Sequence, residues 1–248
     1  MKIAINKNRI VRWLKDYAET NGMDGFVVGI SGGIDSAVTS TLCALTGLKV
    51  KAITMPIHQD PTLHGLAELQ IKWLEDKFNN VSGECIDLTK VYDTFKDVAP
   101  TTELGLANSR ARLRMTTLYA IAADHRLLVA GTGNKVEDFG VGFFTKYGDG
   151  GVDISPIADL MKSQVYEISR EIKIPQEIQD VAPTDGLWGD GRNDEDQLGA
   201  TYDELEWAME FEGGSITERQ AEVLEIYKNH RDKNYHKMIP IPIYKIKS

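Results

Sequence analysis

The sequence contains few cysteines and no long apolar run. Only two of its 248 residues are cysteines, Cys43 and Cys85, and their spacing is not that of a metal-binding pair. We therefore expect two reduced thiols, with neither a disulfide nor a cysteine-bound metal. No apolar stretch approaches the roughly 20 residues that span a bilayer, and the first residues lack the apolar core of a signal peptide. These absences predict a cytoplasmic protein with no membrane partner.

Positive charge is also scarce. The chain has 28 Lys and Arg residues against 37 Asp and Glu residues, a net charge of −9. General nucleic-acid-binding proteins usually present a basic surface, so this function class is excluded, although local basic pockets are not. Hydrophobic residues make up 42% of the chain, enough for a substantial core. The length suits one large α/β domain, or a domain with a helical appendage.

Apolar runs and helical patterns alternate along most of the chain. This order predicts a doubly wound parallel sheet flanked by helices, a Rossmann-like α/β fold, with a helical C-terminal part. The predicted strands are Phe26–Ile30, Val50–Met55, Glu84–Leu88 and Arg126–Ala130. The predicted helices are Ile10–Ala18, Ser36–Leu45, Leu66–Phe78, a short one through Tyr92 and Phe95, Asn108–Asp124, Lys162–Lys173, Glu195–Phe211 and Thr217–Asn229.

A glycine-rich segment lies between the first predicted strand and the helix after it. Its glycines allow the backbone to approach an oxyanion, and the N–H groups of the following helix point toward it. Asp35 adds a carboxylate suited to magnesium beside phosphates. The spacing is not that of a Walker loop, and a glycine-rich turn without a ligand is the alternative. The segment consists of Gly29, Ile30, Ser31, Gly32, Gly33, Ile34, Asp35 and Ser36.

Three further segments have the composition of functional loops. Gly131–Asn134 follows the fourth predicted strand, so it should meet the first glycine-rich segment at one edge of the sheet. Gly140–Asp153 combines five glycines with three aromatic residues and Lys146. A loop of this length inside a compact domain is usually functional. The segment Ala182–Gln197 is a candidate mobile region, and Asp194 within it is expected to cap a helix.

These motifs resemble a known family. Gly29–Ser36 resembles the SGGxDS loop of the ATP-pyrophosphatase superfamily, which cleaves ATP to AMP and pyrophosphate. The run Phe143–Gly151 resembles the signature of NAD synthetases. That family adenylates the nicotinate carboxylate of deamido-NAD with ATP, and ammonia then displaces AMP. The same resemblance extends to Gly131, Thr132, Glu137, Asp153, Pro156, Lys162, Ala182–Thr184, Asp194–Gly199, Tyr202, Asp203, His236 and Lys237.

The resemblance implies a role for individual residues. Gly29–Ser36 would hold the pyrophosphate part of ATP, and Asp35 and Glu137 would be magnesium ligands. A lysine in the first turn of a helix is unfavourable for the helix dipole, and a bound phosphate would explain Lys162 there. Residues implied to contact ATP are Thr132, Lys162 and Thr184. Those implied to contact deamido-NAD are Arg114, Lys146, Asp153, His236 and Lys237. The catalytic set is Asp35, Lys146 and Lys162.

The resemblance has limits and consequences. Many ammonia-dependent relatives carry an ATP-contacting arginine where this chain has Thr54, and Met238 replaces an arginine after His236-Lys237. We expect residues 1–248 to form one synthetase domain without a glutaminase domain, and therefore an ammonia-dependent enzyme. The family also implies a homodimer, for which Trp13 and Tyr17 or the helix from Asn108 offer surface.

Two other functions remain open from the sequence. One is a different SGGxDS ATP-pyrophosphatase that amidates or thiolates another substrate. The other is a module that senses ATP without turnover. A product analysis with ATP, magnesium, deamido-NAD and either ammonium or glutamine would separate them. We also predict that Gly140–Asp153 and Pro183–Asn193 become ordered on ligand binding.

Overall fold

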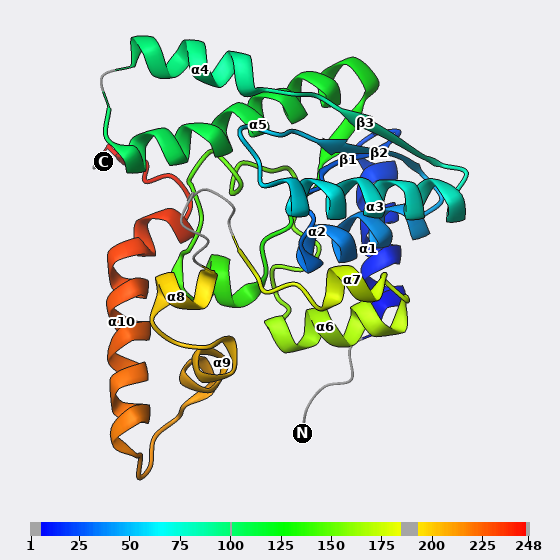
Figure 1. The fold of residues 1–248 in the computed structure, drawn as a ribbon. Coiled ribbons are helices and arrows are strands. Elements are labelled where there is room, and N and C mark those ends of the chain that lie inside the picture. The colour runs from blue at the N-terminus through cyan, green and yellow to red at the C-terminus, as the bar shows by residue number, and fades with distance from the viewer. Residues whose placement is uncertain (1–5, 100, 185–192, 247–248) are drawn as a thin grey trace.

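Four parallel strands form the centre of the molecule. The computed structural model describes residues 6–99, 101–184 and 193–246. Within these ranges the strands are β1 (Gly25–Gly29), β2 (Lys49–Thr54), β3 (Val81–Cys85) and β4 (Leu127–Val129), in the order β3-β2-β1-β4 (Figure 1). Gly29 pairs with Ile53, so the carboxyl ends of β1 and β2 lie side by side. The predicted parallel α/β fold is confirmed.

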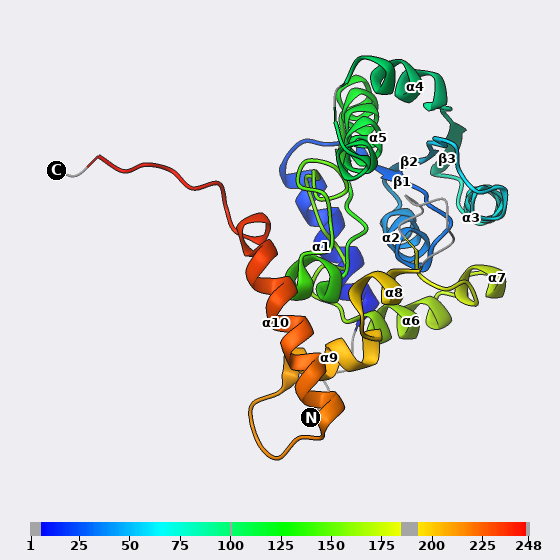
Figure 2. The same ribbon diagram turned by 60° about the vertical axis from the view of Figure 1, so that its left-hand side comes forward.

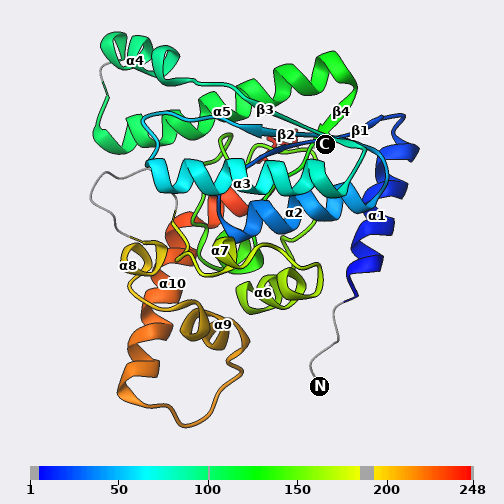
Figure 3. The same cartoon turned by 45° about the vertical axis from the view of Figure 1, so that its right-hand side comes forward.

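Helices connect the strands and cover both faces of the sheet. Residues of β1 alternate between the two faces: Phe26 and Val28 pack with α1, α2, α3 and α6, whereas Val27 packs with α4 and α5. Figure 3 shows the two layers edge-on. The helices are α1 (Lys7–Thr20), α2 (Ile34–Leu45), α3 (Pro61–Lys77), α4 (Thr89–Val98), α5 (Glu103–His125), the π-helix η1 (Val136–Val141), α6 (Lys162–Glu171), α7 (Gln176–Gln179), α8 (Asp194–Leu198), α9 (Tyr202–Glu210) and α10 (Glu218–Met238).

The C-terminal helices build a second, smaller core. Val136 and Val141 of η1 pack there with Leu205 of α9 and Val223 of α10. Helix α10 runs along η1, and the chain beyond Met238 leads away from the body (Figure 2). This core matters for the site because it holds η1, which follows β4, against α9. No helix in the described residues is long and apolar enough to cross a membrane.

Several boundaries differ from those predicted. Strand β3 spans Val81–Cys85, three residues earlier than expected. The helix predicted over 195–211 is interrupted at Gly199, which adopts a left-handed conformation (φ 79°) and separates α8 from α9. The side chain of Asn193, not Asp194, caps α8. Helix α10 continues to Met238, nine residues beyond its predicted end at Asn229, because its contacts with η1 support the added turns.

Candidate active site

A cavity of about 700 Å³ lies at the carboxyl edge of the sheet. It is bounded by the segment after β1, the segment after β4, helix α5 and the C-terminal end of α10. Two residues predicted for the site, Gly32 and Asp153, do not line it. The predicted site residues that do line it are Gly29, Ile30, Ser31, Gly33, Ile34, Asp35, Ser36, Arg114, Thr132, Glu137, Lys146, Lys162, Thr184, His236 and Lys237.

The glycine-rich segment forms a tight turn into α2. Gly32 has φ +91°, and a Cβ there would lie 2.4 Å from the carbonyl oxygen of Leu63, so only glycine fits. Ser36 Oγ donates to the Gly33 carbonyl and accepts from the Ser31 amide. Gly33 is the N-cap of α2 and has no side chain with which to cover the first amides of the helix. The turn therefore leaves backbone donors for an anion, as a phosphate cradle requires.

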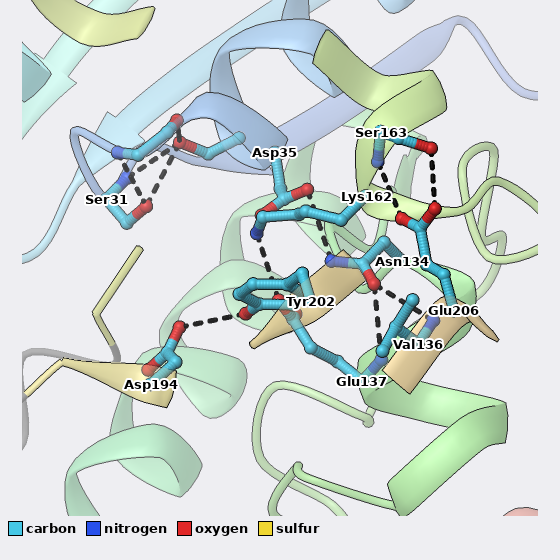
Figure 4. Close-up of polar contacts among 12 residues, drawn as sticks. Ser31, Asp35, Asn134, Val136, Glu137, Lys162, Ser163, Asp194, Tyr202 and Glu206 are labelled. Carbon is cyan, nitrogen blue, oxygen red and sulfur yellow. Dashed lines mark hydrogen bonds and ion pairs between the residues drawn. The ribbon is translucent and has the colours of Figure 1, made fainter. Parts of the chain in front are cut away.

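A buried lysine joins the two predicted metal ligands. Lys162 Nζ lies 2.5 Å from Oδ2 of Asp35 and 3.0 Å from Oε1 of Glu137 (Figure 4). Asp35 comes from the first turn of α2, Glu137 from η1, and Lys162 from the first turn of α6. Lys162 is only 2% exposed. Three residues far apart in the sequence thus meet in one ionic cluster.

Burial and mutual contact shift the protonation of this cluster. Desolvation raises the pKa of Asp35 to about 6, against the lowering effect of Lys162. Burial alone would raise the pKa of Glu137, but Lys162 and hydrogen bonds from neighbours keep it below its ordinary value. Burial alone would lower the pKa of Lys162, and the two carboxylates outweigh this and raise it. At neutral pH the cluster is therefore an ammonium between two carboxylates.

Two residues without a predicted role complete the cluster. Tyr202 donates from Oη to Oε1 of Glu137 over 2.6 Å, and Asn134 Nδ2 lies 3.4 Å from Oδ1 of Asp35. Asn134 Oδ1 also accepts from the amides of Val136 and Glu137, which fixes the start of η1. Tyr202 belongs to the resemblance to NAD synthetases, and Asn134 to the predicted functional loop Gly131–Asn134. Only their three-dimensional contacts reveal which groups they hold.

Helix α6 is fixed by α9. Ser163 donates from its amide and its hydroxyl to the two carboxylate oxygens of Glu206, over 2.8 Å and 2.7 Å (Figure 4). This carboxylate lies at the N-terminal end of α6, where negative charge is favourable. The negative charge of Glu206 offsets the positive end of the α6 dipole, to which Lys162 adds a further positive charge.

The opposite side of the cavity is formed by the Gly140–Asp153 loop and α10. Lys146 Nζ donates to the carbonyl of His236 over 3.2 Å, and Lys237 Nζ donates to the carbonyl of Phe144 over 2.7 Å. Asn234 also donates to the Val141 carbonyl. These contacts bring together Lys146, His236 and Lys237, three residues predicted to bind the second substrate.

Arg114 and Asp153 have contacts of a different kind. Arg114 Nε donates to the Met55 carbonyl, and its Nη2 donates to Gln59 Oε1, so its guanidinium lies at the end of β2. Asp153 accepts from the Val129 amide and from the Tyr119 hydroxyl. Asp153 thus secures the end of β4 from outside the cavity. Its predicted contact with a substrate stays a prediction.

The acidic pair fits a divalent cation. Asp35 and Glu137 converge on a positive group in the structure, since the Lys162 ammonium lies between them. Carboxylate oxygens are the ligands that magnesium prefers, and it usually completes its shell with phosphates and water. In the described residues no cluster of three or more His, Cys, Asp or Glu side chains forms a full metal site. Oxygens of a bound phosphate would complete the shell of a cation held by this pair.

Part of the segment Ala182–Gln197, which was predicted to be mobile, lies outside the described residues. Gly186, Trp188, Gly189 and Gly191 belong to it, and the predicted ordering of Pro183–Asn193 depends on them. Thr184 and Asp194, on either side, line the cavity.

A parallel α/β sheet, a phosphate-type turn after β1 and an acidic pair at the same edge define a nucleotide-binding α/β enzyme. Comparison with known proteins narrows this class. The model of the NAD synthase family matches residues 6–245. The chain belongs to the NAD synthase family.

Individual relatives agree with this assignment. The chain is 38% identical to an NH(3)-dependent NAD(+) synthetase of Alkaliphilus metalliredigens, over 97% of this chain and 98% of the relative. It is 37% identical to the same enzyme of Carboxydothermus hydrogenoformans, over 92% of each. Among solved structures, NMN synthetase from Francisella tularensis matches with a TM-score of 0.87 and 34% identity over 97% of both chains. An NH3-dependent NAD synthetase from Campylobacter jejuni matches with a TM-score of 0.76 and 25% identity, over 96% of this chain and 97% of that one.

Proposed function

We propose that this chain converts deamido-NAD to NAD with ATP and ammonia. The nicotinate carboxylate attacks the α-phosphorus of ATP, which forms an acyl-adenylate and releases pyrophosphate. Ammonia then attacks the acyl carbon, AMP leaves, and the amide of NAD remains. The observation that carries this proposal is the Asp35–Lys162–Glu137 cluster beside the phosphate-type turn, in a chain of the NAD synthase family.

The first step brings two anions together, so it needs positive charge more than acid–base catalysis. The turn Gly29–Ser36 would bind the β- and γ-phosphates through its amides. Lys162 would neutralise charge on the phosphates as the pyrophosphate leaves. Thr132 and Thr184 line the same cavity and are proposed to contact ATP. A magnesium ion held by Asp35 and Glu137 would supply further charge neutralisation.

The second substrate is proposed to bind on the side formed by Lys146, His236 and Lys237. Lys146 and Lys237 bring positive charge to this wall, which suits an anionic nucleotide. Arg114 is also proposed to contact this substrate. Since Arg114 is held at the end of β2, it would do so through the part of its guanidinium that faces the cavity.

A second candidate substrate is the mononucleotide, nicotinic acid mononucleotide. The observation that favours it is the match to an NMN synthetase, with a TM-score of 0.87 against 0.76 for the Campylobacter NAD synthetase. The reacting carboxylate is the same in both substrates. Only the adenylate half of the dinucleotide is missing, so discrimination depends on residues far from the reacting carbon.

One competition experiment tests both candidates. The full chain is incubated with ATP, magnesium, ammonium and equal amounts of deamido-NAD and nicotinic acid mononucleotide. NAD as the main product, with one AMP per NAD, supports the dinucleotide reaction. NMN as the main product would instead support the reaction of the mononucleotide. AMP and pyrophosphate without either amide would refute both.

Three further features are part of the proposal. Ammonia is the proposed nitrogen donor, in keeping with the NH3-dependent relatives, and a parallel incubation with glutamine tests it. The proposed assembly is a homodimer, which sedimentation would show. The proposed location is the cytoplasm, where the ATP consumed by the reaction is available.

A further inference from the structure

Tyr202 lies between two charged groups of the site. It is 6% exposed, and its hydroxyl donates to Oε1 of Glu137 over 2.6 Å. The centroid of its ring lies 4.7 Å from Nζ of Lys162, within the range of a cation–π contact. One aromatic side chain from α9 therefore contacts both partners of an ion pair formed between η1 and α6 (Figure 4).

The ring is held by contacts that do not involve Glu137. Tyr202 begins α9, directly after the N-cap Thr201, whose side chain and that of Glu204 form a capping box. The amide of Tyr202 donates to Glu195 Oε1 over 2.9 Å. Its ring packs in the C-terminal core with Leu198 and Leu205. A residue fixed in this way can impose its position on a partner.

The hydroxyl has one hydrogen and two carboxylates within reach. Asp194 Oδ2 lies 3.3 Å from it, farther than Glu137 Oε1 at 2.6 Å, so the hydrogen points to Glu137. Burial and the neighbouring carboxylates raise the pKa of Tyr202, so the hydroxyl remains a donor at neutral pH.

Both contacts to Glu137 use the same carboxylate oxygen. Lys162 Nζ and Tyr202 Oη each bond to Oε1. The Asn134 side chain also hydrogen-bonds to the Glu137 carboxylate and helps to keep its pKa low. The contact from Tyr202 fixes Oε1, and with it the rotation of the carboxylate, also when the Lys162 ammonium turns toward a phosphate.

We propose that Tyr202 is a positioning residue that orients Glu137 to bind a divalent cation. The inference rests on the proposed function, in which Glu137 is a metal ligand. Tyr202 itself contacts neither the cation nor the substrates. Hydrogen bonds from such supporting residues typically change metal affinity about 10- to 100-fold.

The test compares Tyr202→Phe with the wild-type chain in two measurements. Binding of Mn²⁺ in the presence of a non-hydrolysable ATP analogue is followed by the EPR signal of the free ion. We expect the affinity of the variant to fall about 10- to 100-fold. In turnover, the half-saturating Mg²⁺ concentration should rise by a similar factor, whereas kcat at saturating Mg²⁺ returns to near the wild-type value. Glu137→Gln supplies a double-mutant cycle in which Tyr202→Phe adds little, because both changes act on one group.

Tyr227→Phe is the matched control. Tyr227 packs partly buried against the same C-terminal core, and within the described ranges the structure shows no hydrogen bond to its hydroxyl. It should leave Mn²⁺ binding unchanged. Unchanged Mn²⁺ affinity in Tyr202→Phe, or a loss of kcat that Mg²⁺ does not restore, would overturn the proposal. The Mn²⁺ measurement requires no second substrate, so a wild-type chain that binds Mn²⁺ but forms no amide product refutes the proposed function without affecting this test.

Discussion

Nζ of Lys162 lies 2.5 Å from Oδ2 of Asp35, inside the pair of carboxylates proposed to hold a divalent cation. The ammonium therefore occupies the space between the two proposed ligands of the cation. Two positive groups cannot share this position at low cost, because the site is buried and poorly screened. Cation binding should thus require Lys162 to turn toward the phosphates of ATP.

Replacing Lys162 with methionine removes this competition. We expect Lys162→Met to bind Mn²⁺ at least about 10-fold more tightly than the wild type without nucleotide, since roughly 1.4 kcal/mol of repulsion suffices for that factor. Adenylation should fall at least 100-fold, because a phosphate partner is lost. Titration of Mn²⁺ followed by EPR and release of pyrophosphate measure the two effects. Lys135→Met, which removes a surface partner of Asp159, is the control, and weaker Mn²⁺ binding by Lys162→Met would contradict the argument.

Asp35→Asn tests the other partner. The amide cannot supply an anionic oxygen to a cation and leaves Lys162 with one carboxylate fewer. We expect release of pyrophosphate to fall at least 100-fold, with binding of the second substrate nearly unchanged, since Lys146 and Lys237 lie on the opposite wall. A coupled pyrophosphate assay and calorimetry measure the two quantities. Wild-type pyrophosphate release in this variant would remove Asp35 from the mechanism.

The sequence predicts the sheet better than it predicts the contacts inside the site. Strand β1, the turn after it and helix α2 follow from local patterns of apolar residues and glycines. The contacts of Tyr202 with Glu137 and of Asn134 with Asp35 join residues 65 and 99 positions apart, and no local pattern encodes them. The break at Gly199 does have a local signal, a glycine followed by the capping box of Thr201 and Glu204, which the prediction of one continuous helix overlooks.

Asp153 illustrates a different limit. Its position in a glycine-rich loop and its resemblance to a binding residue predict a role at the substrate. The structure engages both of its carboxylate oxygens, with the Val129 amide and the Tyr119 hydroxyl. The contacts of Asp153 depend on which amide and which hydroxyl the folded chain brings close to its carboxylate, and the sequence alone does not show this.

Two buried threonines allow an effect on ATP binding to be distinguished from an effect on folding stability. Thr54 and Thr39 are 2% and 0% exposed, and neither Oγ1 has a hydrogen-bond partner in the described part of the chain. Removing such a hydroxyl should stabilise the fold by about 1–2 kcal/mol, so both Thr54→Val and Thr39→Val should unfold at higher urea concentration. Only Thr54 lines the cavity, so only Thr54→Val should raise the KM for ATP several-fold. Equal KM values in the two variants would mean that Thr54 does not contact ATP.

Two glycines provide a test of the phosphate turn. Gly32→Ala places a Cβ 2.4 Å from the Leu63 carbonyl at φ +91°, so we expect destabilisation by at least about 2 kcal/mol and loss of ATP binding. Gly65 lies within α3, and a Cβ there meets nothing within 4 Å. Gly65→Ala should therefore stabilise the chain by about 1 kcal/mol with unchanged ATP binding. Urea unfolding and calorimetry with an ATP analogue measure both, and intact ATP binding in Gly32→Ala would show that the turn does not hold the nucleotide.

Acid should lower the stability of the contact between α9 and α10, because it protonates Glu204. Its carboxylate accepts two hydrogen bonds from Arg219 of α10, and these contacts lower the pKa of Glu204 to about 2 from an ordinary 4.5. Because the folded-state pKa is lowered, the stabilisation is complete above pH 4.5 and is lost as the pH falls through 2. The pair is partly exposed, so we expect Glu204→Gln to cost about 0.5–1 kcal/mol at pH 7 and progressively less below pH 4. Urea unfolding of both chains at pH 7, 4 and 3 measures this difference, and a cost that stays constant over that range would show that the charge of Glu204 contributes nothing.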